Sequence, residues 1–235
     1  MKYKAAIFDM DGTILDTLED LRNAFCYALE QGGHRSDYTT EEVSYFIGSG
    51  ALIALRRALA YEAGTALEDL LLIGSEPEQD PAAMEAASRM VEIFMEYYPD
   101  HCEECTKPFP GLIEALEELR GAGVRLAVVS NKFDAAVQIL AEKYFPGCFD
   151  FAIGVSDNYR RKPFPDMIKR CLQVMGADVK EAVYIGDSEI DLQTAASAGI
   201  PCISVAWGNR SEAFLRGQGA DCIIRQPHEL TKVIR

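Results

Sequence analysis

The chain has 235 residues, of which 49% are hydrophobic, and its formal net charge is −14. This length and composition allow a full core, in one large domain or in one domain with an inserted module, so a disordered chain is not the default expectation. The acidic charge repels polyanions, so we expect neither nucleic acid nor an anionic membrane as a partner. Any phosphate that binds has to be held by a local positive site.

The first residues and the cysteines favour a cytoplasmic protein. The segment MKYKAAIFDM has too short an apolar part for a signal peptide, and no stretch reaches the roughly 18 uninterrupted apolar residues of a membrane span. Seven scattered cysteines, an odd number, are typical of reduced thiols. The composition leaves both a monomer and a homodimer open.

Four short apolar runs, at 5–8, 126–129, 182–185 and 202–205, are typical of buried strands. Helical patterns lie between the later runs, and in one of them Ala136, Ile139 and Leu140 are expected to share the apolar face. Strands that alternate with helices predict an α/β fold, with a Rossmann-like parallel sheet covered by helices on both faces.

The segment between the first two strands is far longer than a single crossover helix. Its apolar residues recur at helical spacing, as in Leu18, Leu21 and Phe25, and it shows no strand-like alternation. We therefore predict an all-helical domain at 16–108, inserted into an α/β core formed by 1–15 and 109–235. Within the insert, the composition of 74–81 predicts an exposed loop.

Two acidic residues, Asp9 and Asp11, follow the first strand directly in DMDGT. Ligands of parallel α/β sheets bind at the carboxyl ends of strands, and two acids spaced in this way in an extended segment point in the same direction. Such a pair suits a nucleophile that also binds a metal, followed by a general acid and base. The alternative is a turn, in which Asp and Gly are common.

Ser130 and Asn131 follow the second strand at the corresponding position. A hydroxyl and backbone N–H groups in front of a helix can bind phosphate oxygens. The alternative is that Ser130, Asn131 or Asp134 only caps the helix.

Lys162 lies in KPFPD, where two prolines restrict the backbone and fix the direction in which the lysine leaves it. Its ammonium group can neutralise a nucleophile or a phosphate oxygen. An ordinary solvated surface lysine is the alternative.

Asp187 and Asp191 lie in GDSEID, where the third strand run ends and a helix begins. Four residues apart, the two acids share one side of the first helical turn. Carboxylate oxygens suit Mg²⁺, which binds one or two carboxylates together with water and substrate phosphate. Acids that only complement the helix dipole are the alternative.

Together, these four segments are expected at one edge of the sheet. In this combination the chain resembles the haloacid dehalogenase-like phosphatase superfamily, whose motifs match as DMDGT, Ser130-Asn131, Lys162 in KPFPD and GDSEID. The resemblance spans the whole chain in the expected order. It implies an α/β core with an inserted helical cap, and an enzyme that hydrolyses phosphoric monoesters with Mg²⁺ as cofactor.

The resemblance also implies an aspartyl-phosphate mechanism. Asp9 would be the nucleophile and a Mg²⁺ ligand, and Asp11 the acid and base that also binds the metal through its main-chain carbonyl. Asp187 would complete the metal site, and Asp191 would support it.

The remaining implied roles concern the phosphoryl group. Ser130, with the backbone at Asn131, would hold the phosphoryl oxygens, and Lys162 would balance their charge.

The position of the helical insert resembles the branch that contains phosphoglycolate phosphatase and β-phosphoglucomutase. The segment Gly48-Ser49-Gly50 before a helical pattern, and the return KPFPG at 107–111, favour the phosphoglycolate phosphatase type. This implies 2-phosphoglycolate as the substrate, selected by Gly48, Ser49 and Gly50 in the cap. A glycine-rich turn before an ordinary amphipathic helix is the alternative for this segment.

Other functions remain open at this point. A β-phosphoglucomutase-like mutase, a pyrophosphatase or a nucleotidase would use the same core, whereas a dehalogenase has no use for Asp11 or the metal site. A binding protein on this fold is disfavoured because every catalytic position holds a competent residue. Cys102 and Cys105 form a single C-x-x-C, which is weak evidence for zinc, and Trp207 is interpreted as a packing residue.

Overall fold

The computed structural model describes residues 2–74 and 81–235, so residues 75–80 of the predicted loop lie outside the described residues. The chain divides into two compact units. One comprises Met1–Asp16 with Lys107–Arg235, and the other is Thr17–Thr106. The domain limits at 15/16 and 108/109 stay a prediction, because contacts define compact units and not functional domains.

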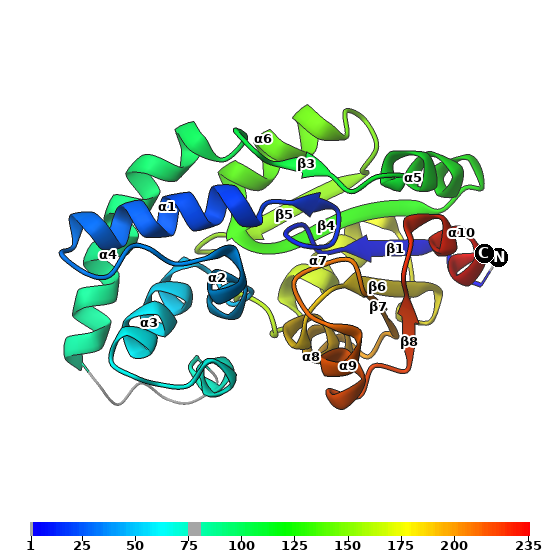
Figure 1. Ribbon diagram of the computed structural model, residues 1–235. Helices are drawn as coiled ribbons and strands as arrows, with labels where there is room; N and C mark the ends of the chain where they lie inside the picture. The colour runs from blue at the N-terminus through cyan, green and yellow to red at the C-terminus, as the bar shows by residue number, and fades with distance from the viewer. Residues whose placement is uncertain (1, 75–80) are drawn as a thin grey trace. The chain divides into compact units, whose positions relative to one another are not determined.

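The first unit is built on a six-stranded sheet in the order β5-β4-β1-β6-β7-β8, in which every neighbouring pair is parallel (Figure 1). The predicted α/β fold with a parallel sheet is therefore confirmed. Sequence patterns missed the two edge strands, β5 and β8. The strands are β1 (Ala5–Phe8), β4 (Arg125–Phe133), β5 (Phe151–Val155), β6 (Ala182–Gly186), β7 (Cys202–Val205) and β8 (Cys222–Ile224).

Helices cover both faces of this sheet, with α5 and α6 on one face and α7 and α8 on the other (Figure 1). On the second face, Ile7 and Val129 of the sheet pack with Ile168 and Cys171 of α7 in a buried apolar core. The helices of this unit are α5 (Leu112–Gly121), α6 (Asp134–Tyr144), α7 (Asp166–Met175), α8 (Glu189–Ala198), α9 (Glu212–Gly217) and α10 (Leu230–Ile234).

One helical residue was placed wrongly by the sequence pattern. Ala136 and Leu140 are buried in α6 as expected, but Ile139 is 49% exposed. The buried stripe of α6 consists of Ala136, Val137, Leu140 and Ala141. Ile139 lies outside this stripe because successive helical residues are rotated by about 100°.

The outer edge of β5 is capped by side chains of α6. The backbone N–H of Gly154 donates to Asp134 Oδ1 at 2.8 Å, and Gln138 Nε2 donates to the carbonyl of Ala152 at 2.9 Å. A Cβ atom at Gly154 would lie 2.5 Å from the carbonyl oxygen of Lys132, so only glycine allows this close approach. The carbonyl of Ala152 and the N–H of Gly154 are thus satisfied by side chains within the molecule.

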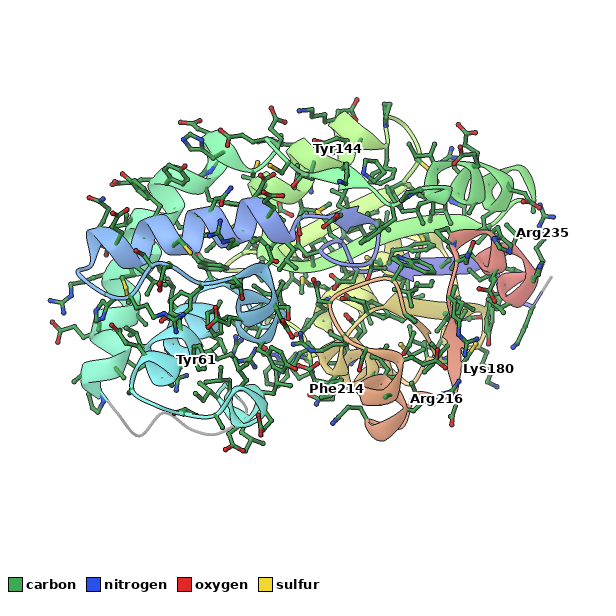
Figure 2. All side chains as sticks on the ribbon, viewed as in Figure 1. Tyr61, Tyr144, Lys180, Phe214, Arg216 and Arg235 are labelled. Carbon is green, nitrogen blue, oxygen red and sulfur yellow. The ribbon has the colours of Figure 1, made fainter. Side chains whose placement is uncertain are left out.

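The ends of the chain lie side by side next to α5 (Figure 1). The Lys2 N–H donates to the main-chain oxygen of Arg235 at 2.6 Å, and Arg235 forms an ion pair with Glu118 of α5 at 2.8 Å (Figure 2). These contacts attach the segment before β1 to the last helix.

The described residues of the second unit form helices joined by turns and loops, with no strand among them, which confirms the all-helical insert. Phe25 of α1 stacks on Phe94 of α4 with ring centroids 4.7 Å apart, and Phe94 stacks on Tyr98 at 4.9 Å. The elements are α1 (Leu18–Gln31), α2 (Thr40–Phe46), α3 (Ala51–Glu62), the 3₁₀ helix η1 (Leu67–Leu72) and α4 (Pro81–His101). Two short antiparallel strands of the first unit, β2 (Leu15–Asp16) and β3 (Lys107–Pro108), flank the insert in sequence.

Among the described residues, no single helix is both long and apolar enough to span a membrane. By length and composition alone, the pair α2 and α3 meets such a criterion together, but the two helices are bent by 120° relative to each other. Both contribute buried residues to the helical unit, as a core helix does.

Candidate active site

The carboxyl ends of β1, β4 and β6 bring the predicted acidic and polar residues together. Asp9 follows β1, Ser130 lies within β4 near its end, and Asp187 follows β6. All three side chains are buried, with residue exposures of 7%, 1% and 1%. Because β4 and β6 are the two neighbours of β1, this edge of the sheet concentrates groups that are far apart in the sequence.

Lys162 lies at the centre of a buried network. Its Nζ is 2.8 Å from Asp9 Oδ1, 2.8 Å from Asp191 Oδ1 and 3.3 Å from the Tyr184 hydroxyl. Its side chain is only 2% exposed, so the interpretation as a solvated surface lysine is wrong. The backbone N–H of Met10 also donates to Asp9 Oδ1 at 2.7 Å. One oxygen of the Asp9 carboxylate is therefore held by two donors.

Asn131 fixes the backbone that carries this lysine. Its Oδ1 accepts a hydrogen bond from the Lys162 N–H at 2.7 Å, and its Nδ2 donates to the Lys162 carbonyl at 3.3 Å. The side chain of Asn131 therefore positions Lys162, which leaves the backbone at Asn131 as the expected contact to phosphate. Ser130 Oγ accepts a hydrogen bond from the backbone N–H of Lys132 at 3.1 Å.

Asp187 is held by two residues, Thr13 and Asn209, that were not among the predicted site residues. Thr13 Oγ1 donates to Asp187 Oδ1 at 3.2 Å, and the Asn209 N–H donates to Oδ2 at 2.6 Å. Trp207 packs near Phe109, with ring centroids 6.4 Å apart, and its indole N–H donates to the Thr13 carbonyl at 3.0 Å. Trp207 is thus a packing residue that also fastens the loop after β1 to the loop after β7.

Asp191 is fully buried and combines two tasks. Its Oδ2 accepts hydrogen bonds from the N–H and the hydroxyl of Ser188, which forms the capping box of α8. Its Oδ1 binds Lys162 and the Tyr184 hydroxyl, the latter at 3.2 Å. Oδ2 therefore acts as expected for an acid at a helix start, whereas Oδ1 belongs to the network around Lys162.

The carboxylates at this edge are suited to a divalent cation. Asp9, Asp187 and Asp191 each offer an oxygen, and these atoms lie within 4.8 Å of one another. Burial and the charge of Asp191 raise the pKa of Asp9 well above its usual value, although Lys162 acts in the opposite direction. Burial and Asp191 likewise raise the pKa of Asp187 to about 7. Carboxylates that destabilise one another in this way fit a bound cation, which would neutralise them.

The same carboxylates and the same burial also act on the pKa of Lys162. Burial lowers the pKa of Lys162, but the carboxylates of Asp191 and Asp9 outweigh burial and raise the pKa above its usual value. The lysine therefore carries its charge at neutral pH.

Lys132 is a second buried lysine at this edge and was not among the predicted site residues. Its Nζ lies 2.9 Å from Asp11 Oδ1, and the side chains of Lys132 and Asp11 are 4% and 20% exposed. It directly follows Ser130-Asn131, so its position next to a motif was the available signal.

In the helical unit, Gly48 and Gly50 have positive φ angles of 108° and 86°. Arg57 binds this turn from α3: its guanidinium donates to the Ile47 carbonyl at 3.2 Å and to Ser49 Oγ at 3.3 Å. The expected role of Gly48, Ser49 and Gly50 in substrate selection stays a prediction.

The C-x-x-C pair does not belong to the acidic cluster. Cys102 is buried and its Sγ donates to the Pro99 carbonyl at 3.5 Å, whereas Cys105 is exposed. Within 2–74 and 81–235, Asp9, Asp187 and Asp191 form the one group of metal-ligand type. All seven cysteines are free thiols.

Comparisons with known proteins identify the family of the chain. The family model for haloacid dehalogenase-like hydrolases matches residues 6–205. Phosphoglycolate phosphatase of Agrobacterium fabrum (strain C58 / ATCC 33970) is 31% identical and aligns over 86% of this chain and 80% of that protein. For phosphoglycolate phosphatase of Aquifex aeolicus (strain VF5), the identity is 27%, over 98% and 96% of the two chains.

Solved structures show the same relationship over the full length. The crystal structure of an inferred phosphoglycolate phosphatase from Lactobacillus delbrueckii subsp. bulgaricus ATCC BAA-365 superposes with a TM-score of 0.96 and 52% sequence identity. That alignment covers 100% of this chain and 99% of the other. The chain therefore belongs to the haloacid dehalogenase-like hydrolase family and is a phosphatase of that family.

Proposed function

We propose that the chain is a Mg²⁺-dependent phosphatase that cleaves a small phosphorylated metabolite, 2-phosphoglycolate in the first place, through an aspartyl phosphate on Asp9. The observation that carries the proposal is the buried Asp9 carboxylate, held by Lys162 and placed next to Asp187 and Asp191. The relatives named phosphoglycolate phosphatase support the substrate.

The geometry supports a two-step reaction. Since Oδ1 of Asp9 is held by Lys162 and Met10, we assign Oδ2 as the nucleophile. Oδ2 forms a bond to phosphorus while the bond to the ester oxygen breaks, and Asp11 gives a proton to the leaving alcohol. Asp11 then takes a proton from water, which attacks phosphorus and releases inorganic phosphate and free Asp9.

Positive charge around the phosphoryl oxygens completes the proposal. The Ser130 hydroxyl and the backbone N–H at Asn131 would bind these oxygens, and Lys162 would offset their negative charge. Asp9, Asp187 and the main-chain carbonyl of Asp11 would hold Mg²⁺, with Asp191 in support. When bound, the ion would supply electrostatic stabilisation of the transferring phosphoryl group.

The proposal is tested by a panel of phosphorylated metabolites, namely 2-phosphoglycolate, glucose phosphates, nucleoside monophosphates and pyrophosphate, compared by kcat/KM. We expect Mg²⁺-dependent release of inorganic phosphate and the highest kcat/KM for 2-phosphoglycolate. Conversion of a glucose phosphate without phosphate release would instead show a mutase.

Magnesium is expected to stabilise the protein more at high pH than at low pH. The pKa of Asp187 is raised in the folded state from 3.8 to about 7, so between these values the folded protein retains a proton that the unfolded chain has released. Without metal, stability therefore falls as the pH rises through this window. A cation replaces the proton, so the Tm difference between MgCl₂ and EDTA is expected to be larger at about pH 8 than at about pH 5.

The matched control for this experiment is Asp187→Asn, which keeps the shape of the side chain and removes its charge. We expect this variant to show a smaller Tm difference with a weaker pH dependence. A Tm difference that is equal at both pH values in the unmodified protein would contradict the assignment of Asp187 as a metal ligand.

Gly50→Val is expected to separate substrate selection from catalysis. Valine is strained at the φ angle of 86° and would disturb a turn that we assign to substrate contact. We expect kcat/KM to fall by roughly tenfold or more for 2-phosphoglycolate, and much less for p-nitrophenyl phosphate.

The control is Gly64→Val in the same unit, because Gly64 also has a positive φ angle, 99°, and no atom lies within 4 Å of an added Cβ. A proportional loss for both substrates in Gly50→Val, with a lower Tm, would assign Gly50 to folding alone.

A further inference from the structure

Lys132 carries a buried positive charge that the four motifs leave without a task. With its side chain 4% exposed, its ammonium group has lost most of its water and needs an opposite charge nearby. Asp11 provides that charge at 2.9 Å. Lys162, in contrast, binds Asp9 and Asp191, so the two lysines serve different carboxylates of the same site.

The backbone of Lys132 is fixed on two sides. Its N–H donates to Ser130 Oγ at 3.1 Å, and its carbonyl oxygen lies so close to Gly154 that an added Cβ would be 2.5 Å away. The direction in which the lysine side chain leaves β4 is therefore set by both β4 and β5. This arrangement favours a defined position for the ammonium group over a mobile one.

The backbone of Asp11 is fixed as well. Gly12 has a φ angle of 81°, and its N–H donates to the Leu15 carbonyl at 2.8 Å, which closes a tight turn directly after Asp11. With the main chain held by the turn, the side-chain torsions of Asp11 set where its carboxylate lies. The ion pair from Lys132 to Oδ1 restricts that rotation.

We infer that Lys132 is a positioning residue for Asp11. By holding Oδ1, it directs Oδ2 toward the ester oxygen of the substrate. Asp11 enters the first step protonated on Oδ2, with Lys132 donating a hydrogen bond to Oδ1; the proton passes to the ester oxygen as its bond to phosphorus breaks, which leaves Asp11 ionised beside Lys132. In the second step Oδ2 takes a proton from the attacking water as the bond between Asp9 and phosphorus breaks, which restores the protonated Asp11. The inference rests on the proposed role of Asp11 as general acid and base.

The test compares two substrates that differ mainly in the leaving group. Phenyl phosphate releases a basic oxygen that needs a proton, whereas the oxygen of p-nitrophenyl phosphate leaves readily without one. Lys132→Met is expected to lower kcat/KM by about 10²-fold for phenyl phosphate and by clearly less for p-nitrophenyl phosphate, because the general acid is misplaced. Asp11→Asn is expected to show the same selectivity.

Three further variants make the test specific. Lys132→Arg keeps the positive charge, so it should retain more of the phenyl phosphate activity than Lys132→Met, and it replaces the methionine variant if that protein fails to fold. Lys169→Met removes an exposed lysine of α7 and should leave kcat/KM unchanged for both substrates. The double variant Asp11→Asn/Lys132→Met should be no slower than Asp11→Asn alone, because both changes impair the same function, proton transfer by Asp11.

Three results would overturn the inference. Lys132→Met could lower kcat/KM by the same factor for both substrates, which would indicate that Lys132 acts on the phosphoryl group and not on the leaving group. The two changes could also act additively in the double variant, which would make Lys132 independent of Asp11. If Asp11→Asn itself showed no leaving-group selectivity, the proposed acid role of Asp11 would fail and the role of Lys132 would fail with it.

Discussion

Asp9→Asn protein is expected to fold normally and to show no turnover of any phosphate ester. An amide has nearly the shape of the carboxylate but lacks the nucleophilic oxygen that forms the acyl phosphate. The fold should tolerate the change, because burial and the neighbouring carboxylates already raise the pKa of Asp9 and so disfavour its charge. We expect the Tm in EDTA to be no lower than that of the unmodified protein.

The measurement is phosphate release with excess Mg²⁺, together with the intact mass of the protein. The mass is needed because deamidation of the introduced asparagine would restore the aspartate and create a false residual activity. Activity close to that of the unmodified enzyme, in protein of the correct mass, would remove the central claim of an aspartyl phosphate.

Lys162→Met is expected to be damaging in two ways. Loss of the ammonium leaves the Asp9 and Asp191 carboxylates buried without their shared partner, and breaking such a pair costs about 3–5 kcal/mol of unfolding free energy. Because the positive charge also stabilises the transferring phosphoryl group, kcat should fall by about 10²-fold or more. Urea unfolding in EDTA and kcat with saturating Mg²⁺ measure the two effects.

Lys162→Arg is the matched variant, since it keeps the charge but cannot reproduce the compact ammonium between two carboxylates. We expect it to recover part of the stability and little of the activity. If Lys162→Met matched the unmodified protein in both unfolding free energy and kcat, a role of Lys162 in stability and catalysis would be contradicted.

Local sequence patterns predicted the inner strands because these are continuous apolar runs that end in polar motifs. The edge strands do not show this pattern. β5 contains a glycine, and β8 has three residues. β5 depends on contacts from α6 that no local pattern reveals, since Asp134 and Gln138 bind its backbone across 20 and 14 residues.

The site was predictable to the extent that its residues follow strands. Asp9, Ser130 and Asp187 lie at neighbouring strand ends, as a parallel sheet requires. For Lys132 the only local signal is its place directly after Ser130-Asn131, and a lone lysine in a sequence is typical of a surface, so its buried contact with Asp11 is defined only by the folded chain. Trp207 reaches the Thr13 carbonyl across 194 residues, a contact that only the folded chain defines.

The two α6 side chains at the edge of the sheet also affect how this protein behaves when molecules crowd together. An unpaired edge strand offers a row of amide and carbonyl groups on which a strand of another molecule can assemble. In β5 the outward amide of Gly154 and the outward carbonyl of Ala152 are already occupied by Asp134 and Gln138. An incoming strand would have to displace these two side chains, one of them charged, to pair with the Gly154 amide and the Ala152 carbonyl. These two contacts therefore disfavour growth of the sheet from molecule to molecule, the route to fibrillar aggregates, at this edge.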